Sequence, residues 1–422
     1  MPRTPAHTPA ATAPAVERGT EQATALDRLP RVVDLLAARA AEHDRDGTFP
    51  YQGVEAVHEA GLLTLTVGQR YGGPGAGLAD TVQVLARLGR GDASVALLTA
   101  NTLLHHAEQA RTAPWPAALY RRLLTESRRG PALVGTLRAR PGRPPAVTAH
   151  WHGDAWQLTG RAAHCPGAEA LAWLAVEART EEQQPRTGWF LVRADSPGLE
   201  IDPAADQLGL RAAAGHDVLL DGARVGTDAA LLPRTPAPAT HPLTAAWRQL
   251  AVTAVLLGTA RAALDWSAGR LRGSTAHRRP VGELDARLTG AEELVHGLAA
   301  RTDADPAAAE RASTVQLLAA RTAADTVQQA LTLAGSAGLD RRHPLERHLR
   351  DTLSLRTQLP AEDAVLDALG QALLAKHMGK WTPQDVVFDS ALLRRLAAGG
   401  TAKEFMAPWT RRRAYNPSRQ RS

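Results

Sequence analysis

The stretch Leu331–Leu374, LTLAGSAGLDRRHPLERHLRDTLSLRTQLPAEDAVLDALGQALL, decides the fold. An apolar-periodic helix runs into it and ends at Gly335 and Gly338, because glycine adopts backbone angles that other residues resist. Pro344 then restarts a polar turn or short helix, and after Pro360 another helix begins with acidic residues that suit the helix dipole. Glycine-ended turns beside clustered arginines indicate either a plain helix–turn–helix or a surface that contacts a diphosphate.

Composition favours packed helices with a small aliphatic core. The chain has 422 residues, of which 44% are hydrophobic and only 4% aromatic, and this length predicts two or three domains. The net charge is +6 and the pI about 10.0. Because the arginines are spread along the chain among acidic residues, we expect no nucleic-acid partner and assign the positive charge to cofactor phosphates or acyl-CoA-like substrates.

Several features of the sequence bear on the compartment of the protein. Cys165 is the single cysteine, so an internal disulfide framework is excluded. No run of 18 or more apolar residues is present, which predicts no membrane span. The first residues lack the apolar core of a secretory signal, and a cytoplasmic location is expected.

The periodicity of apolar residues predicts an α+β, mostly α fold. Helical spacing dominates both ends of the chain, with Pro30 tolerable only in the first turn of a first helix. Between them the period changes to two, and 146–151 and 156–159 form a predicted β-hairpin. The expected parts are a disordered tail (1–25), an N-terminal helical domain (26–130), a middle β-barrel-like domain (131–233), a linker (233–241), a C-terminal four-helix bundle (242–376) and an extension (377–422).

Two pairs of motifs carry a resemblance to a known family. The first pair is Gly335-Ser-Ala-Gly-Leu339 followed by Pro344-Leu-Glu-Arg-His-Leu-Arg-Asp351, and the second is Tyr71-Gly-Gly-Pro-Gly75 followed by Arg90-Gly-Asp-Ala-Ser-Val-Ala96. Together they resemble the acyl-CoA dehydrogenase superfamily over roughly residues 26–376. The glycine cluster near Tyr71 lacks the G-x-G-x-x-G spacing of a nucleotide loop, so we interpret it as a tight loop between helices.

The resemblance implies a flavin, FAD with FMN as the alternative. In the family, glycines at the positions of Gly335 and Gly338 help to bind the FAD of a neighbouring subunit. An arginine that contacts the same diphosphate corresponds to Arg278, with Arg272 and Arg279 as alternatives. A site of this kind implies a homodimer or homotetramer.

The flavin ring is expected beside two segments of the middle domain. The resemblance assigns Gly135 and Thr136 to one of them and His164 and Pro166 to the other. A family Trp or Phe usually stands at His164, which has the alternative of a surface or packing role, and a hydroxyl donor usually stands at Pro166. The form His-Cys-Pro-Gly-Ala is nearer the Phe-Cys-Ser-Gly-Ala of dibenzothiophene monooxygenases, which are flavin monooxygenase relatives.

The catalytic base of the family is missing from both of its usual places. One place holds Gln358-Leu-Pro360 and the other Trp247-Arg-Gln249. The candidate catalytic residues are therefore Gln358 itself and Glu362, a nearby carboxylate. Glu362 has the alternative role of an acidic residue at the start of a helix. We expect no metal site, because the fifteen histidines form neither H-E-x-x-H nor a Cys/His zinc spacing.

Three functions follow from the resemblance. Family frequency places first an α,β-desaturation of an acyl thioester, with hydride transfer to FAD N5. The second is a two-component monooxygenase that takes reduced flavin from a partner reductase and hydroxylates nitrogen, sulfur or carbon, and this chemistry needs no α-proton base. The third is a non-catalytic flavin-binding or scaffold homologue.

Overall fold

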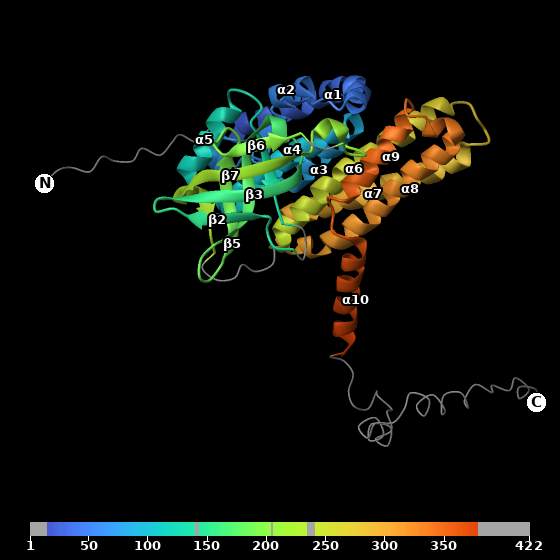
Figure 1. The fold of residues 1–422 in the computed structure, drawn as a ribbon. Coiled ribbons are helices and arrows are strands. Elements are labelled where there is room, and N and C mark those ends of the chain that lie inside the picture. Colours follow the sequence, from blue (N-terminus) through green and yellow to red (C-terminus); the bar gives the residue numbers. More distant parts are fainter. Residues whose placement is uncertain (1–14, 140–142, 204–205, 234–240, 379–422) are drawn as a thin grey trace, which may run out of the picture. The chain divides into compact units, whose positions relative to one another are not determined.

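The computed structural model describes residues 15–139, 143–203, 206–233 and 241–378 (Figure 1). The chain divides into two compact units, residues 1–362 and residues 363–422, and each is described by itself. The predicted linker and C-terminal extension lie almost wholly outside the described residues. Within the described part, no helix is long and apolar enough to pass through a lipid bilayer.

The N-terminal domain is built from helices, as the periodicity predicted. They are α1 (Ala15–Asp46), α2 (Tyr51–Glu59), α3 (Leu78–Gly91), α4 (Ala93–Thr112) and α5 (Ala117–Ser127). Short 3₁₀ turns lie between the elements of the whole chain: η1 (Leu62–Thr64), η2 (Gln69–Tyr71), η3 (Ala168–Ala170), η4 (Arg211–Ala213), η5 (Thr227–Ala229), η6 (Pro306–Arg311) and η7 (Gly335–Leu339).

Helix α1 differs from two predictions, a disordered tail over residues 1–25 and a first-turn position for Pro30. The helix begins at Ala15, inside the segment 1–25 that we expected to be disordered, and Pro30 lies within it rather than in its first turn. The segment 15–25 contains no proline and several good helix formers, so a helix propagates through it. Pro30 removes one backbone donor, and the buried Leu29 and Val32 on either side hold the helix against the core.

The middle domain is an eight-stranded sheet. Its strands are β1 (Leu133–Leu137), β2 (Val147–Trp151), β3 (Ala155–Cys165), β4 (Leu171–Thr180), β5 (Thr187–Arg193), β6 (Leu199–Asp202), β7 (His216–Gly226) and β8 (Ala230–Leu231). The order is β6-β7-β3-β2-β4-β5-β8, with β1 parallel to β4. The predicted hairpin is confirmed, because β2 and β3 are antiparallel and pair Trp151 with Trp156.

The C-terminal helices are α6 (Pro242–Arg270), α7 (Arg278–Ala304), α8 (Ala312–Ala334), α9 (Pro344–Arg356) and α10 (Glu362–Met378). Helix α6 packs on α3, α7, α8 and α9, and is buried along most of its length. Helix α9, which we expected as a polar turn or short helix, packs against both α6 and α8. The α+β, mostly α fold class with helical end domains and a middle sheet domain is therefore confirmed.

Helices α3 and α6 approach closely enough to require glycine on both sides. A Cβ on Gly258 would lie 2.0 Å from the carbonyl oxygen of Ala86, and a Cβ on Gly89 would lie 2.6 Å from that of Val255. The N-terminus of α3 is also closed by the C-terminal helices. Asp303, in the last turn of α7, accepts hydrogen bonds from the amides of Leu78 (2.7 Å) and Ala79 (2.9 Å).

The motifs that suggested the family meet in one buried polar junction. Asp92 begins α4, and its Oδ1 accepts from the amides of Ser94 (2.7 Å) and Val95 (3.1 Å). Asp351, on α9, accepts from the amide of Leu210 at 2.7 Å. The charge of Arg347 acts on both carboxylates, and burial raises the pKa of each. The motifs therefore join α4, α9 and the loop before β7.

The neighbouring Arg350 extends this junction to α1. Its guanidinium donates to both carboxylate oxygens of Asp44 (2.9 and 2.7 Å), to Glu346 and to the carbonyl oxygen of Leu208. Gly209 lies directly against this residue, because a Cβ there would be 2.2 Å from the carbonyl oxygen of Arg350. The Arg-Asp pair thus holds three segments together.

The first prediction concerns the α3–α6 contact. Gly258→Ala should lower the free energy of unfolding by about 3 kcal/mol, because the added methyl group meets a backbone carbonyl that cannot move aside. Urea unfolding monitored by circular dichroism measures the change. Gly290→Ala is the control, since Gly290 lies in α7 and a Cβ added there would meet nothing within 4 Å. That variant should gain about 0.5–1 kcal/mol from helix propensity. Equal effects would contradict the close contact.

The second prediction concerns the polar junction. Asp351→Leu should destabilise the protein by about 3–5 kcal/mol, since the Leu210 amide and the Arg347 charge lose a buried partner. Differential scanning fluorimetry and urea titration report the loss. Asp325→Leu, at an exposed position on α8, should change stability by less than about 0.5 kcal/mol. A tolerated Asp351→Leu would show that the junction contributes little.

Candidate functional site

A cavity of about 370 Å³ lies between the N-terminal helices, the sheet and the first C-terminal helix. Its walls come from α4, the end of β1, the middle of β4, the start of β5, β8 and the start of α6. Within this cavity a set of charged and aromatic side chains converges from segments far apart in the sequence. We treat it as the candidate active site, because converging polar groups in a concave pocket are the usual mark of one.

Helix α4 supplies a polar stripe to the cavity. Asn101, His105, Glu108 and Arg111 all line it, and their spacing of four, three and three residues keeps them on one helical face. The rest of α4 is almost entirely buried and mostly apolar. A polar stripe on such a helix has no role in packing the core, so it indicates a face turned to a ligand.

Arginines and tryptophans form the walls in stacked pairs. The guanidinium carbon of Arg111 lies 4.4 Å from the centre of the Trp247 ring, and that of Arg138 lies 4.8 Å from the Trp189 ring. The rings of His105 and Trp115 stack with centroids 6.5 Å apart and planes 26° from parallel. Cation–π contacts of this kind hold guanidinium groups in place without neutralising their charge.

Two guanidinium groups of the cavity form no ion pair with a described residue, although the charges of Glu108 and Asp303 act on Arg111. Burial and the nearby charge of Arg138 lower the pKa of Arg248 to about 10, and burial lowers the pKa of Arg111 to about 10. Both side chains therefore stay cationic at neutral pH. Neither forms a salt bridge or a side-chain hydrogen bond with a described residue, and Nη1 of Arg111 is buried without a partner.

A neutral imidazole completes the unpaired groups. His105 is only 8% exposed, and burial lowers its pKa to about 4. Its Nε2 is buried and has no hydrogen-bond partner among the described residues. A buried polar atom left unpaired costs stability, and this nitrogen and Nη1 of Arg111 are both covered by protein atoms rather than open to the cavity.

The two carboxylates of the cavity are partly engaged. Oε2 of Glu177, on β4, accepts a hydrogen bond from the amide of Ala139 at 2.8 Å. Glu108 lies one turn before Arg111, and its charge raises the pKa of that guanidinium. Both side chains line the cavity with the arginines.

Of the residues predicted to contact a flavin ring, Thr136 reaches the cavity. Thr136 lies on β1, half-buried, and is paired with Ala175 of β4, which also lines the cavity. Gly135 precedes it and is buried, and a Cβ there would lie 2.4 Å from Cδ1 of Leu171. The glycine therefore lets β1 lie close to β4 and sets the position of Thr136.

His164 and Pro166 lie at the end of β3, away from the lining residues of the cavity. His164 is exposed and has a positive φ of 60°, and its amide donates to Oδ1 of Asp217 at 3.0 Å. Pro166 is half-buried in the turn before η3. The intervening Cys165 is buried, and burial raises the pKa of its thiol to about 12, so it stays protonated.

The residues predicted to meet a diphosphate lie at the ends of C-terminal helices. Arg278 is the exposed first residue of α7. Gly335 ends α8 with φ 64° and ψ −152°, a conformation that strongly favours glycine, and a Cβ added there would meet nothing within 4 Å. Gly338 is buried against Leu331.

The two predicted catalytic residues do not reach the cavity. Gln358 is half-buried after α9, where its backbone N–H donates to the carbonyl oxygen of Leu355 at 3.0 Å. Glu362 begins α10 and accepts hydrogen bonds from the guanidinium of Arg321, which lower its pKa, and it lies 3.8 Å from Arg356. A carboxylate held in this way is a weak base, and the ion pair provides a structural role for it.

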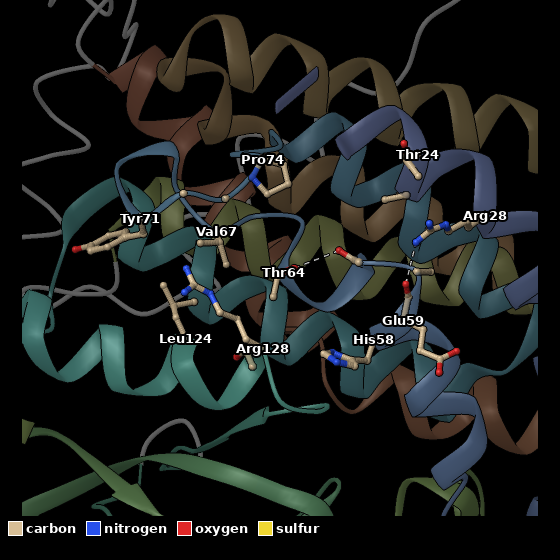
Figure 2. A pocket seen from close by; sticks show the side chains of 16 residues that line it. Thr24, Arg28, His58, Glu59, Thr64, Val67, Tyr71, Pro74, Leu124 and Arg128 are labelled. Carbon is tan, nitrogen blue, oxygen red and sulfur yellow. Dashed lines mark hydrogen bonds between the residues drawn. The ribbon is translucent and has the colours of Figure 1, made fainter. Parts of the chain in front are cut away.

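A larger hollow, about 680 Å³, lies in the N-terminal helical domain (Figure 2). It is lined by side chains of α1, α2 and α5 and by Tyr71, Gly72 and Pro74 of the glycine-rich loop. At one side of the hollow, Arg28 donates a hydrogen bond to the backbone carbonyl oxygen of Glu59 at 3.0 Å. None of the predicted site residues lines this hollow, so we assign the chemistry to the smaller cavity.

Sequence reasoning missed the arginines and tryptophans of the cavity. Trp247 and Arg248 were identified only as a place where a carboxylate is absent, and the histidines of the cavity were considered only as metal ligands. A usable signal was present in the polar residues of 101–112, which recur at helical spacing on an otherwise apolar helix. Their partners on β1 and β5 carry no such signal.

Comparison with known proteins identifies the family that the chain resembles. Residues 21–111 match the model of the acyl-CoA dehydrogenase N-terminal domain, and residues 244–359 match that of the acyl-CoA dehydrogenase C-terminal domain. The chain is 27% identical over 369 residues to the putative acyl-CoA dehydrogenase YdbM of Bacillus subtilis, covering 82% of this chain and 95% of that protein.

Other relatives carry names of a different activity. The chain is 30% identical over 388 residues to L-evernosamine nitrososynthase of a Micromonospora species, covering 83% of this chain and 90% of that protein. Among solved structures, KijD3 in complex with FMN and dTDP-3-amino-2,3,6-trideoxy-4-keto-3-methyl-D-glucose superposes with a TM-score of 0.75 at 28% identity. That match covers 87% of this chain and 95% of KijD3.

Proposed function

Since this chain belongs to the acyl-CoA dehydrogenase family, we propose that it is a flavin-dependent monooxygenase that adds oxygen to the amine nitrogen of a small molecule. The family comprises flavoprotein oxidoreductases of both kinds, dehydrogenases and monooxygenases. The proposal reverses the order in which the sequence placed the two reactions. The reason lies in the residues that line the cavity.

The observation that carries the proposal is Arg248. The resemblance places a dehydrogenase base either at this position of α6 or near Gln358. At the first the cavity is lined by a guanidinium, which cannot take up an α-proton at neutral pH. At the second stands an amide outside the cavity. Oxygenation of an amine needs no base at the α-carbon of a thioester, so this pair of residues is compatible with it.

The residues of the chain fit a flavin at two places. The half-buried hydroxyl of Thr136 borders the cavity as a donor for the ring, and the open turn at Gly335 leaves space for a diphosphate. Pro166 has no hydrogen-bond donor, so among the residues predicted to contact the flavin ring we assign Thr136 as the donor. FAD is the cofactor we propose, with FMN as the alternative that the KijD3 structure names.

The reaction balances with a reduced flavin and molecular oxygen. When bound, the reduced flavin supplies two electrons to oxygen, one oxygen atom enters the N–H bond of the substrate, and the other leaves as water. The chain itself excludes bulk water with its tryptophan walls and orients the substrate. A carboxylate of the cavity, Glu108 or Glu177, holds the proton that an ammonium group must lose first.

Two partners follow from the proposal. The reduced flavin comes from a separate reductase, as the resemblance to two-component flavin monooxygenases implies. The glycines near residue 335 are proposed to meet the flavin of a second copy, as the resemblance implies, so the active form is a homodimer or homotetramer. Analytical ultracentrifugation of the flavin-loaded protein measures this state.

The third prediction separates the two reactions. Anaerobic titration of flavin-loaded protein with a series of acyl-CoA thioesters should leave the flavin absorbance near 450 nm (roughly placed, a general flavin band) unchanged. After chemical reduction, the same protein should consume oxygen. Bleaching by any thioester would instead establish a dehydrogenase, with Glu108 or Glu177 as its base. A protein that binds no flavin would favour the non-catalytic alternative.

The fourth prediction tests the cofactor position. Gly335→Trp should abolish flavin retention through gel filtration, since the indole fills the open turn. Gly335→Ala carries the same backbone strain with little bulk, and it should retain flavin while losing about 1–3 kcal/mol of stability. Full retention by the Trp variant would exclude this turn from the flavin site.

A further inference from the structure

The guanidinium group of Arg248 is the least compensated charge in the cavity. Burial and the like charge of Arg138 lower the pKa of Arg248, and no carboxylate raises it. It makes no salt bridge or side-chain hydrogen bond with a described residue. Arg248 is half-buried, and a partly desolvated, unpaired cation is costly unless something else supplies the negative charge.

The remaining groups of the cavity do not supply that charge. Glu108 is one helical turn from Arg111 and acts on that guanidinium. Glu177 accepts the backbone amide of Ala139. Three arginines therefore face two carboxylates across the same space.

We propose that the substrate carries an oxyanion, a phosphate or a carboxylate, and that Arg248 binds it with Arg138 beside it. The inference rests on the proposed function in taking this cavity as the substrate site. A guanidinium binds two oxygens of one oxyanion through parallel N–H donors, which makes it suited to either group. The volume of about 370 Å³ restricts the occupant to a small molecule or one end of a larger one.

The tryptophans give the anion site its selectivity. Trp189 and Trp247 stack on Arg138 and Arg111 and fix these guanidinium planes. Rings at the cavity wall also present apolar faces to the rest of the substrate. The expected substrate therefore has an oxyanion at one end and an oxidisable amine at the other.

The fifth prediction measures anion binding without turnover. Isothermal titration calorimetry of the flavin-saturated protein with inorganic pyrophosphate and with acetate, at fixed ionic strength, should show one site for at least one of them. Arg248→Met should weaken that binding tenfold or more, about 1.4 kcal/mol. Arg122→Met, at an exposed position on α5, removes the same net charge and should leave the affinity unchanged.

Each outcome decides one point. Tight pyrophosphate binding that depends on Arg248 indicates a phosphorylated substrate, and acetate binding that depends on it indicates a carboxylate. Binding of neither anion, or equal losses in the two variants, overturns the inference. Pyrophosphate that displaces the flavin also overturns it, because the arginines would then hold the cofactor. The oxygen-consumption experiment is independent, so the proposed function and this inference fail separately.

Discussion

The structure depends on a buried polar junction in which carboxylates hold backbone amides from other segments. Asp92 starts α4, Asp351 fixes the loop at Leu210, and Arg350 ties α9 to α1 and to Leu208. These contacts join the N-terminal helices, the sheet domain and the C-terminal helices at one place. The cavity lies among the same three parts, so the positions of its walls are set by contacts that never touch a ligand.

The cavity separates what the fold determines from what individual side chains determine. Its location is given by the packing of α4, β1 and α6, which the family shares. Its chemistry is given by the few side chains that project from those elements. The guanidinium of Arg248 places positive charge in the cavity from the start of α6, a helix that is buried along most of its length. The reaction is thus read from the lining residues rather than from the fold.

Much of the fold was accessible from the sequence, and much less of the site. The glycine and Pro-Leu-Glu-Arg motifs predicted the C-terminal helices, and the period of two predicted the β2–β3 hairpin, because both patterns are local. The start of α1 at Ala15 was missed because the proline-rich composition before it outweighed good helix formers. The cavity could not be assembled, since Arg111, Arg138 and Arg248 come from α4, the end of β1 and α6. Likewise, the pairing of Glu362 with Arg321 across 41 residues has no local signal.

The capping of α3 by Asp303 has a consequence for synthesis of the chain. The cap and the amide of Leu78 are 225 positions apart in the sequence. While the ribosome is making the sheet domain, the first turn of α3 has no acceptor from α7, and the α3 surface that receives Gly258 is bare. The N-terminal helices therefore reach their final stability only after the C-terminal helices emerge. An apolar surface left open for so long is one that chaperones recognise, so maturation in the cell depends on how quickly the last helices arrive.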